Sequence, residues 1–267
     1  MAITGFYEKV NGIKIYCETN NGPDDEATVI CLHTAGRENR QYHELMDLLA
    51  DKYRLISFDM PGHGKSWPLP GNKVVNNFRD YGKWIWDVVT ALDVENPIIM
   101  GCSMGGNICY YMGINYPVRA IVPCQGADYT PNIAPEVLYL LDHPYVSCQH
   151  SHLEFTECLI GRKTSQERKD FIFWGVRQEI GIVKQGDLTQ YNGFDVRDQV
   201  CEIACPTLII HGLDDTGPTD EMARRTTAKM KKCQNLVYKP IEGYGHFIIV
   251  EAPEIVAEAL DEFIRTL

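Results

Sequence analysis

A serine lies between small residues in the stretch Gly-Cys-Ser-Met-Gly-Gly, directly after an apolar run. Gly101, Ser103 and Gly105 fit a Gly-x-Ser-x-Gly pattern between a predicted strand and a helix predicted to begin at Met104. Such a turn strains the backbone of the serine and lifts its hydroxyl out of the sheet, while the flanking glycines avoid a steric clash. The amide of Met104 then points into the same space from the start of the helix. The pattern predicts that Ser103 is a nucleophile.

A serine hydroxyl needs two further groups to become reactive. It is a weak nucleophile at neutral pH unless an imidazole accepts its proton, and a carboxylate must orient that imidazole. The stretch 211–215 supplies Asp214 and Asp215, and the stretch 243–247 supplies His246. Both stretches follow predicted strands, and the order serine, aspartate, histidine is typical of a serine at a strand-to-helix turn. The spacing therefore predicts nucleophilic acyl chemistry.

The elements that must position these groups alternate along the chain. Asn11 and Gly12 separate two alternating apolar segments, 6–10 and 13–18, as in a tight β-hairpin. Apolar runs typical of strands buried on both faces follow at 28–32, 54–58, 97–100, 120–124, 205–211 and 236–240. Helical patterns occur at 41–51, 77–92, 104–116, 219–232 and from Pro253 onwards. Eight strands interleaved with helices predict an α/β sheet with both faces covered.

Residues 127–200 interrupt this alternation. They contain helical patterns but no convincing buried strand, and the stretch 164–167 resembles a capping box with Thr164 as its first residue. We therefore expect a helical cap, or lid, over 127–200. The core domain would consist of 1–126 and 201–267, so that the cap is an insertion between two strands of the sheet.

The chain resembles the α/β-hydrolase family over nearly its whole length. Five motifs occur in the order of the family: His-Thr-Ala-Gly at 33–36, Asp-Met-Pro-Gly-His-Gly-Lys-Ser at 59–66, the serine turn, the aspartate loop and the Gly-His loop. The resemblance implies an eight-stranded, mostly parallel sheet flanked by helices, with an inserted cap and without a cofactor or a catalytic metal. It implies that Ser103 is the nucleophile and His246 the general base. It also implies that the backbone amides of Ala35 and Met104 form the oxyanion hole.

The orienting acid stays open between neighbouring residues. The family usually places it three residues after the glycine, which here favours Asp215. Counting back from Pro218 favours Asp214, because this loop is one residue shorter than usual. Asp128, which follows the strand at 120–124, is a third alternative because some relatives place their acid there. We take Asp215 as the prediction.

The predicted activity follows from this set of groups. We expect a cofactor-independent serine hydrolase, similar to carboxylesterases, that cleaves a small-molecule ester, thioester or lactone through an acyl-enzyme on Ser103. Hydrolysis of a carbon–carbon bond in a β-diketone or ring-cleavage product, and acyl transfer to an acceptor other than water, are alternative reactions. A ligand sensor with vestigial catalysis is the alternative from another class of protein. Serine at the nucleophile position argues against epoxide opening and halide displacement.

Arg37, Phe173 and Trp174 are candidate substrate-binding residues. Arg37 and Arg40 follow the predicted oxyanion segment and could attract a substrate carboxylate, although a solvated surface position is the favoured alternative. Phe173 and Trp174 could roof the pocket or pack inside the cap. Cys102 adjoins the nucleophile without a sign of activation, so we expect a packed thiol.

Composition restricts the partners. The 267 residues carry a formal net charge of -11, which argues against a nucleic-acid or anionic-membrane partner. The ten cysteines are irregularly spaced, and several lie in apolar runs, so buried reduced thiols are expected. The sequence shows neither an export signal nor an apolar stretch of membrane-spanning length. We expect a soluble cytoplasmic protein, monomer or homodimer, whose partner is a small-molecule acyl substrate.

A short stretch rich in histidine and cysteine could in principle bind a metal. It contains His143, Cys148, His150 and His152. Their irregular spacing lacks the recurring ligand pairs of structural metal sites. We therefore favour pocket lining or plain surface for these residues.

Overall fold

The computed structural model describes residues 3–25, 27–131 and 148–267, and of residues 148–151 only the backbone. The described residues form one eight-stranded sheet in the order β1-β2-β4-β3-β5-β6-β7-β8. Its strands are β1 (Thr4–Val10), β2 (Ile13–Thr19), β3 (Thr28–Leu32), β4 (Arg54–Phe58), β5 (Ile98–Cys102), β6 (Ala120–Cys124), β7 (Thr207–Gly212) and β8 (Leu236–Ile241). The pairs β1–β2 and β2–β4 are antiparallel, and the remaining pairs are parallel. The predicted eight-stranded, mostly parallel sheet is confirmed.

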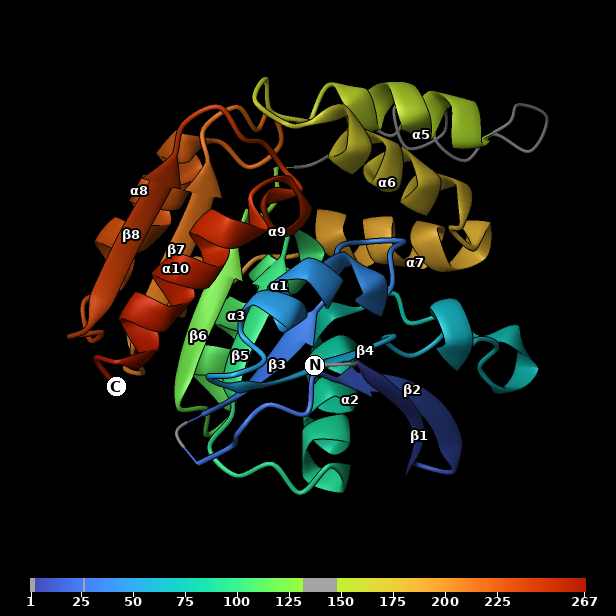
Figure 1. The fold of residues 1–267 in the computed structure, drawn as a ribbon, viewed down its shortest axis with the longest axis horizontal. Coiled ribbons are helices and arrows are strands. Elements are labelled where there is room, and N and C mark those ends of the chain that lie inside the picture. The colour runs from blue at the N-terminus through green and yellow to red at the C-terminus, as the bar shows by residue number, and fades with distance from the viewer. Residues whose placement is uncertain (1–2, 26, 132–147) are drawn as a thin grey trace.

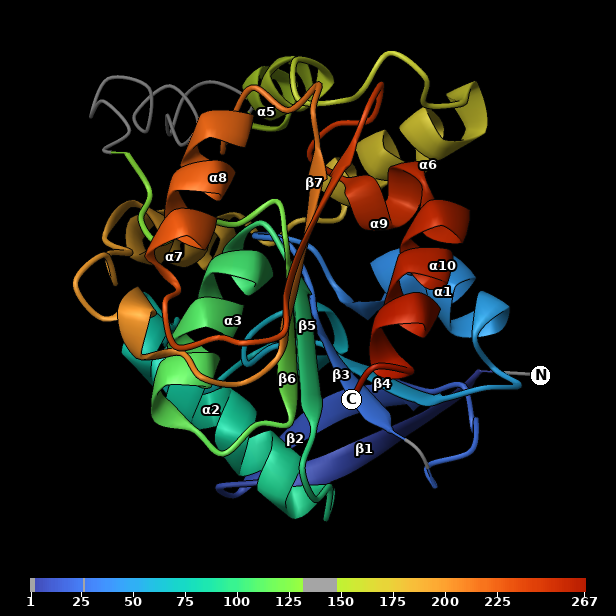
Figure 2. The same ribbon diagram turned by 90° about the vertical axis from the view of Figure 1, so that its left-hand side faces the viewer.

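Helices cover both faces of this sheet. The helices of the described residues, whether or not they flank the sheet, are η1 (Asn39–Tyr42), α1 (His43–Leu48), η2 (Gly64–Ser66), η3 (Pro70–Asn72), α2 (Phe78–Ala91), α3 (Met104–Asn115), α5 (Cys148–Glu157), α6 (Gln166–Arg177), α7 (Gly181–Asn192), η4 (Val200–Glu202), α8 (Asp220–Lys229), α9 (Ile248–Glu251) and α10 (Pro253–Ile264). Figure 2 shows α2 and α3 on one side of the sheet and α1 and α10 on the other. The helix predicted at 41–51 is therefore a 3-10 turn followed by a short α-helix.

The central strands supply both halves of the core. In β3, Ile30 and Leu32 pack in the cluster with α2 and α3, whereas Val29 and Cys31 pack in the cluster with α1 and α10. All four side chains are 0% exposed. Burying an aliphatic side chain of this size contributes about 1.5–3 kcal/mol relative to leaving it in water. The continuous apolar run predicted to be buried on both faces is confirmed, and it gives the loops after these strands a rigid base.

The N-terminus of α6 differs from the capping box expected at 164–167. Ser165, not Thr164, is the N-cap residue, and its hydroxyl accepts from the amide of Arg168 at 3.3 Å. The hydroxyl of Thr164 instead donates to the carboxylate of Glu251 at 2.5 Å. Because Thr164 is hydrogen-bonded to the buried carboxylate of Glu251, Ser165 rather than Thr164 caps the helix.

The interval between β6 and β7 contributes α5, α6 and α7. Figure 1 shows these three helices stacked above the ends of the strands, apart from the helices that flank the sheet. The described residues 127–131 and 148–200 contain no strand, only an isolated bridge between Tyr129 and Asp195. Residues 132–147 of the predicted cap lie outside the described residues. In the described part of the chain, no helix combines the length and apolarity needed to cross a membrane.

Candidate active site

Ser103 lies at the turn between β5 and α3. Its backbone has φ 58° and ψ −113°, a conformation that costs a non-glycine residue about 1–3 kcal/mol. Two backbone hydrogen bonds hold the turn: the amide of Ser103 donates to the carbonyl of Cys124 at 2.9 Å, and its carbonyl accepts from the amide of Asn107 at 2.8 Å. The residue is 4% exposed. The sheet and the helix therefore fix the position of the hydroxyl.

Crowding explains the glycines on either side of this turn. A Cβ atom on Gly101 would overlap the carbonyl oxygen of Gly105, and a Cβ atom on Gly105 would lie 2.5 Å from the carbonyl oxygen of Leu32. Both obstacles are backbone atoms, so no flexible side chain can move aside. The local sequence is thus dictated by the close approach of β3, β5 and α3.

Three side chains from separate loops form a hydrogen-bonded chain. His246 Nε2 lies 2.7 Å from Ser103 Oγ, and His246 Nδ1 lies 2.7 Å from Asp215 Oδ2. An ionised carboxylate only accepts hydrogen bonds, so Nδ1–H donates to Asp215 and Nε2 can accept the hydroxyl proton. Each of the three residues is less than a tenth exposed. Such an arrangement can move a proton from a serine to an imidazole during nucleophilic attack.

Asp215 is fixed by donors other than the imidazole. Its Oδ1 accepts from the amide of Gly217 at 2.7 Å, and its Oδ2 accepts from the side-chain amide of Gln125 at 2.8 Å. Gln125 is fully buried directly after β6 and also donates to the carbonyl of Gly245 at 2.9 Å. It therefore connects the loops that carry the carboxylate and the imidazole. Sequence analysis missed Gln125 because a single glutamine after a strand belongs to no motif.

Glu251 holds the loop that carries His246. Its buried carboxylate accepts from the amides of Gly245 at 2.9 Å and Phe247 at 2.8 Å, on either side of the imidazole. It also accepts from the amide of Gly161 at 2.8 Å, in the connection between α5 and α6. One carboxylate thus joins the imidazole loop to the helices between β6 and β7. This residue was also missed, since nothing in the sequence distinguishes it from a surface glutamate.

The three candidate acids lie in different surroundings. Of these described carboxylates, only Asp215 is hydrogen-bonded to the imidazole. The carboxylate of Asp214 accepts from the side chain of Arg162 at 2.7 Å and from its amide at 2.9 Å. Asp128 accepts from Lys229 Nζ at 2.6 Å. The loop therefore directs two adjacent aspartates to opposite sides.

A cavity of about 300 Å³ opens over Ser103, and we call it the Ser103 cavity. Its walls come from both layers of the molecule. Ala35, Ser103 and His246 line it from the core, whereas Phe155, Leu188 and Tyr191 line it from α5 and α7. Its volume and mixed lining suit a small organic molecule with an apolar portion.

Two residues are predicted to form the oxyanion hole: Met104 adjoins Ser103 in the chain, and Ala35 lines the same cavity as Ser103. Met104 is the first residue of α3, where backbone amides have no partner within the helix. Ala35 lines the Ser103 cavity. The segment around Ala35 is anchored because the amide of Gly36 donates to Asp187 at 2.7 Å. The wall of the cavity is thus tied to α7, which carries Asp187.

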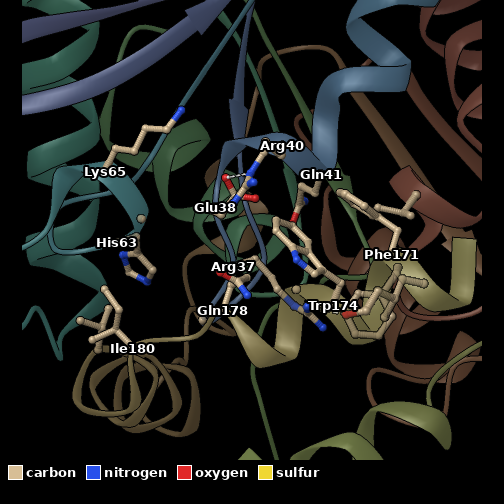
Figure 3. Close-up of a pocket in the computed structure, with 17 residues that line it drawn as sticks. Arg37, Glu38, Arg40, Gln41, His63, Lys65, Phe171, Trp174, Gln178 and Ile180 are labelled. Atoms are coloured by element: carbon tan, nitrogen blue, oxygen red, sulfur yellow. Dashed lines mark hydrogen bonds and ion pairs between the residues drawn. The ribbon is translucent and has the colours of Figure 1, made fainter.

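A second cavity of about 330 Å³, the outer cavity, adjoins the first and shares Arg37 and Phe247 with it. Figure 3 shows His63 and Lys65 on one side of it and Phe171 and Trp174 on the other; Arg37, Glu38, Arg40 and Gln41 lie between them. Cationic and aromatic side chains therefore dominate this second space.

The predicted pocket residues of α6 are only partly placed in these cavities. Trp174 lines the outer cavity and not the Ser103 cavity, while the described residue Phe173 lines neither. Phe171 lines the outer cavity instead and stacks on Trp174, with ring centres 5.7 Å apart. Residues three apart share one face of a helix, whereas adjacent residues do not. Phe173 was therefore the wrong choice for this face.

Arg37 and Arg40 differ in exposure. The side chain of Arg37 is 8% exposed, so the surface position favoured from the sequence is wrong for this residue. Arg40 is 35% exposed, pairs with Glu38 at 2.7 Å and lies 4.2 Å from the ring centre of Trp174. Arg37 alone of the two lines the Ser103 cavity, and its Nη1 donates to the carbonyl of Ile172 in α6 at 2.7 Å.

The stretch rich in histidine and cysteine, for which pocket lining or plain surface was favoured over a metal site, falls mostly outside the described side chains. His143 lies outside the described residues, and of Cys148 and His150 only the helical backbone is described. His152 lines the Ser103 cavity, and its Nδ1 lies 2.6 Å from Glu179 Oε2. Among the described residues, no group of three or more His, Cys, Asp or Glu side chains is arranged to hold a metal ion.

The thiol beside the nucleophile is packed. Cys102 is 1% exposed, and its Sγ lies 3.2 Å from the carbonyl of His246. Burial raises the pKa of the Cys102 thiol to about 12. All nine cysteines with described side chains are free, and Cys158 is exposed rather than buried as expected.

Comparison with known proteins agrees with this fold. Residues 27–126 match the family model described as alpha/beta hydrolase fold. An esterase from Exiguobacterium antarcticum superposes with a TM-score of 0.86 at 20% identity, over 98% of this chain and 100% of that one. The chain has the α/β-hydrolase fold. At this identity the structural likeness shows the fold alone.

Several curated relatives of this chain are named as hydrolases. The (E)-2-((N-methylformamido)methylene)succinate hydrolase of Acinetobacter baylyi is 24% identical over 252 residues, which cover 89% of this chain and 90% of the relative. The 3-oxoadipate enol-lactonase 1 of the same organism is 24% identical over 265 residues, which cover 92% of each chain. These relatives support hydrolase chemistry for the α/β-hydrolase chain described here.

Proposed function

We propose that the protein is a serine hydrolase that cleaves a small-molecule ester, thioester or lactone. The observation that carries the proposal is the hydrogen-bonded chain from Ser103 Oγ through His246 to Asp215, with both links at 2.7 Å, at the base of a cavity. The curated relative named as an enol-lactonase supports the same reaction class.

In the proposed reaction, Ser103 Oγ attacks the substrate carbonyl while His246 Nε2 takes its proton. The carbonyl oxygen becomes an anion, which the amides of Ala35 and Met104 would stabilise by about 3–4 kcal/mol each. His246 then donates its proton to the leaving group, and the acyl group remains on Ser103. Water, deprotonated by the same imidazole, releases the acid and restores the hydroxyl.

We further propose that α5, α6 and α7 act as a cap that selects the substrate. Support comes from Phe155, Leu188 and Tyr191, which line the Ser103 cavity from α5 and α7. Lining from a separate layer excludes bulk water from the reacting groups and shapes the space for the acyl group. The length and branching of the substrate would then depend on these side chains rather than on the core.

Labelling by a fluorophosphonate tests the nucleophile directly. The wild-type protein is expected to take up one probe per chain, and Ser103→Ala is expected to take up none. Hydrolysis of p-nitrophenyl esters should disappear in the same variant. Parallel assays with a vinylogous diketone and with added alcohol distinguish carbon–carbon hydrolysis and acyl transfer from ester hydrolysis. Ligand binding without labelling or turnover would overturn the proposal in favour of a sensor.

A further inference from the structure

Arg37 is a buried arginine in the wall between the Ser103 cavity and the outer cavity. It follows the segment that carries Ala35, and its side chain is 8% exposed. Figure 3 shows it among the residues that surround the outer cavity. A guanidinium remains charged even when buried and offers five N–H donors, so its partners can be counted.

The contacts of Arg37 leave one end of the guanidinium without a partner. Its Nη1 donates to the carbonyl of Ile172 in α6 at 2.7 Å, and its Nε lies 3.7 Å from Glu179 Oε1, too far for a hydrogen bond. Its Nη2 is buried and has no hydrogen-bond partner among the described residues. A buried donor without an acceptor is costly unless a ligand supplies one. Nη2 is therefore available to an acceptor on a bound molecule.

Two buried cations beside the Ser103 cavity share one carboxylate. Arg37 and the buried Lys184 lie 3.7 Å and 3.6 Å from Glu179. His152 shares the same carboxylate, but burial lowers the pKa of His152 and leaves it neutral near pH 7. Glu38 also acts on Arg37 but forms its own ion pair with a neighbouring arginine at 2.7 Å. Glu179 balances at most one of the two cations, so an anionic group bound at Arg37 would be stabilised there.

Phe247 relates Arg37 to the reacting groups. The centre of its ring lies 5.1 Å from the guanidinium carbon of Arg37 and 5.3 Å from the centre of the His246 imidazole. Arg37, His246 and Ser103 all line the same cavity. A small molecule whose carbonyl lies at Ser103 can therefore extend an acidic group to Arg37. Apolar side chains such as Leu159 line the same cavity and suit a hydrocarbon link between the two groups.

We propose that the substrate of the Ser103 cavity carries a carboxylate that binds the guanidinium of Arg37. The substrate class is then an ester, thioester or lactone derived from a dicarboxylic acid, rather than a simple fatty acyl ester. This inference rests on the proposed function of Ser103. The competing explanation is that Arg37 only fastens α6 to the core through Ile172. That role is independent of the charge on the substrate, so substrate charge separates the two explanations.

Matched pairs of esters supply the test. Each pair consists of a p-nitrophenyl monoester of a dicarboxylic acid, in a series from succinate to suberate, and the uncharged methyl ester of the same compound. A charge-assisted hydrogen bond from Nη2 of Arg37 is expected to favour the free acid by about 10- to 100-fold in kcat/KM at the best chain length. The effect should lie mainly in KM. Equal kcat/KM for both members at every length would overturn the proposal.

Variants assign the preference to Arg37. Arg37→Gln is expected to abolish the ratio between charged and uncharged esters, and Arg37→Lys to retain part of it. Gly175→Ala keeps all charges, but its Cβ would overlap Nη1 of Arg37 and displace the guanidinium, so the ratio should also fall. Lys65→Gln is the matched control, since Lys65 is a cation that lines the outer cavity and not the Ser103 cavity and pairs with Glu18 rather than Glu38, and it should keep the ratio. If Arg37→Gln slows both esters equally and leaves the ratio intact, Arg37 is a structural clamp.

A binding measurement separates failure of this inference from failure of the proposed function. In Ser103→Ala, calorimetry compares the monoamides of glutaric and adipic acid, which keep one carboxylate, with the uncharged diamides, each with and without the further change Arg37→Gln. Tighter binding of the monoamide, lost with Arg37, supports the anion site even if no ester is turned over. Equal binding of monoamide and diamide in the presence of Arg37 refutes the anion site even if fluorophosphonate labels Ser103.

Discussion

Replacing Asp215 with asparagine tests whether this carboxylate orients and charges the imidazole. Three donors converge on Asp215: His246 Nδ1 at 2.7 Å and Gln125 Nε2 at 2.8 Å meet Oδ2, while the amide of Gly217 meets Oδ1 at 2.7 Å. An asparagine can place its single oxygen toward the first two donors and its amide toward Gly217. In that orientation only the amide of Gly217 faces another donor. In the reverse orientation both His246 Nδ1 and Gln125 Nε2 face a donor. The variant should therefore keep the imidazole tautomer and lose mainly the negative charge.

The magnitude follows from the charge that develops during attack. When Ser103 transfers its proton, His246 becomes an imidazolium whose buried ionic partner is Asp215. Removing one member of a buried ion pair typically costs about 3–5 kcal/mol. Each 1.36 kcal/mol corresponds to a factor of ten in rate, so kcat should fall by about 10²- to 10⁴-fold. The cost arises in the transition state, so KM should change little.

Asp214→Asn is the matched control. Asp214 pairs with Arg162, whose side chain is 60% exposed, and such pairs contribute about 0–1 kcal/mol. Its kcat should therefore stay within about threefold of the wild type. Both variants are assayed with a p-nitrophenyl ester at saturating concentration, and thermal unfolding verifies that both remain folded. The reasoning is refuted if Asp215→Asn keeps a kcat within threefold of the wild type, or if Asp214→Asn loses as much activity.

Two further predictions concern stability and are measured by chemical denaturation. Gly101→Ala forces a Cβ against the carbonyl oxygen of Gly105 and should cost about 1–3 kcal/mol or more of unfolding free energy. In the control Gly181→Ala the new Cβ has no atom within 4 Å, so the unfolding free energy should stay within about 0.5 kcal/mol of the wild type. Equal effects of the two changes would contradict the explanation by crowding. Burial alone would lower the pKa of His63, but the carboxylate of Asp187 at 2.8 Å outweighs burial and raises it. A raised pKa of His63 in the folded state stabilises the protein most at pH values below the pKa of the unfolded chain, which is near 6.5. The difference in unfolding free energy between the wild type and Asp187→Asn should therefore shrink as the pH rises above about 6.5, by up to about 1.4 kcal/mol per pH unit. A difference that stays constant or grows over that range would show that His63 is not the coupled group.

Local patterns predict the sheet and the serine turn because their causes are local. The apolar run of β3 is continuous since side chains on both faces are buried, and a strand of this kind is recognisable without its neighbours. The glycines around Ser103 are likewise required by one sharp turn, so their spacing is visible in five consecutive residues. His246 could be predicted for a similar reason, because its loop directly follows a recognisable strand.

Contacts between distant segments escape such reasoning. Arg37 follows a turn and carries a charge, which favours the surface, yet α6 covers it from 135 positions further along the chain. Gln125 supports Asp215, and Glu251 supports the loop of His246, through hydrogen bonds whose partners are invisible in the sequence. Phe173 was misplaced because the face of α6 that meets the cavity depends on how the helix packs on the core.

By itself, the sequence determined the order of strands and helices, the strained turn at Ser103 and the pair of later loops that carry an aspartate and a histidine. Each of these depends on residues close together in the chain, where steric and periodic constraints act directly. Only the tertiary structure decided that Asp215, and not Asp214, meets the imidazole. It also decided that Arg37 is buried with a free donor beside the cavity. Both outcomes depend on the direction of side chains packed against distant segments, and no pattern of neighbouring residues encodes that direction.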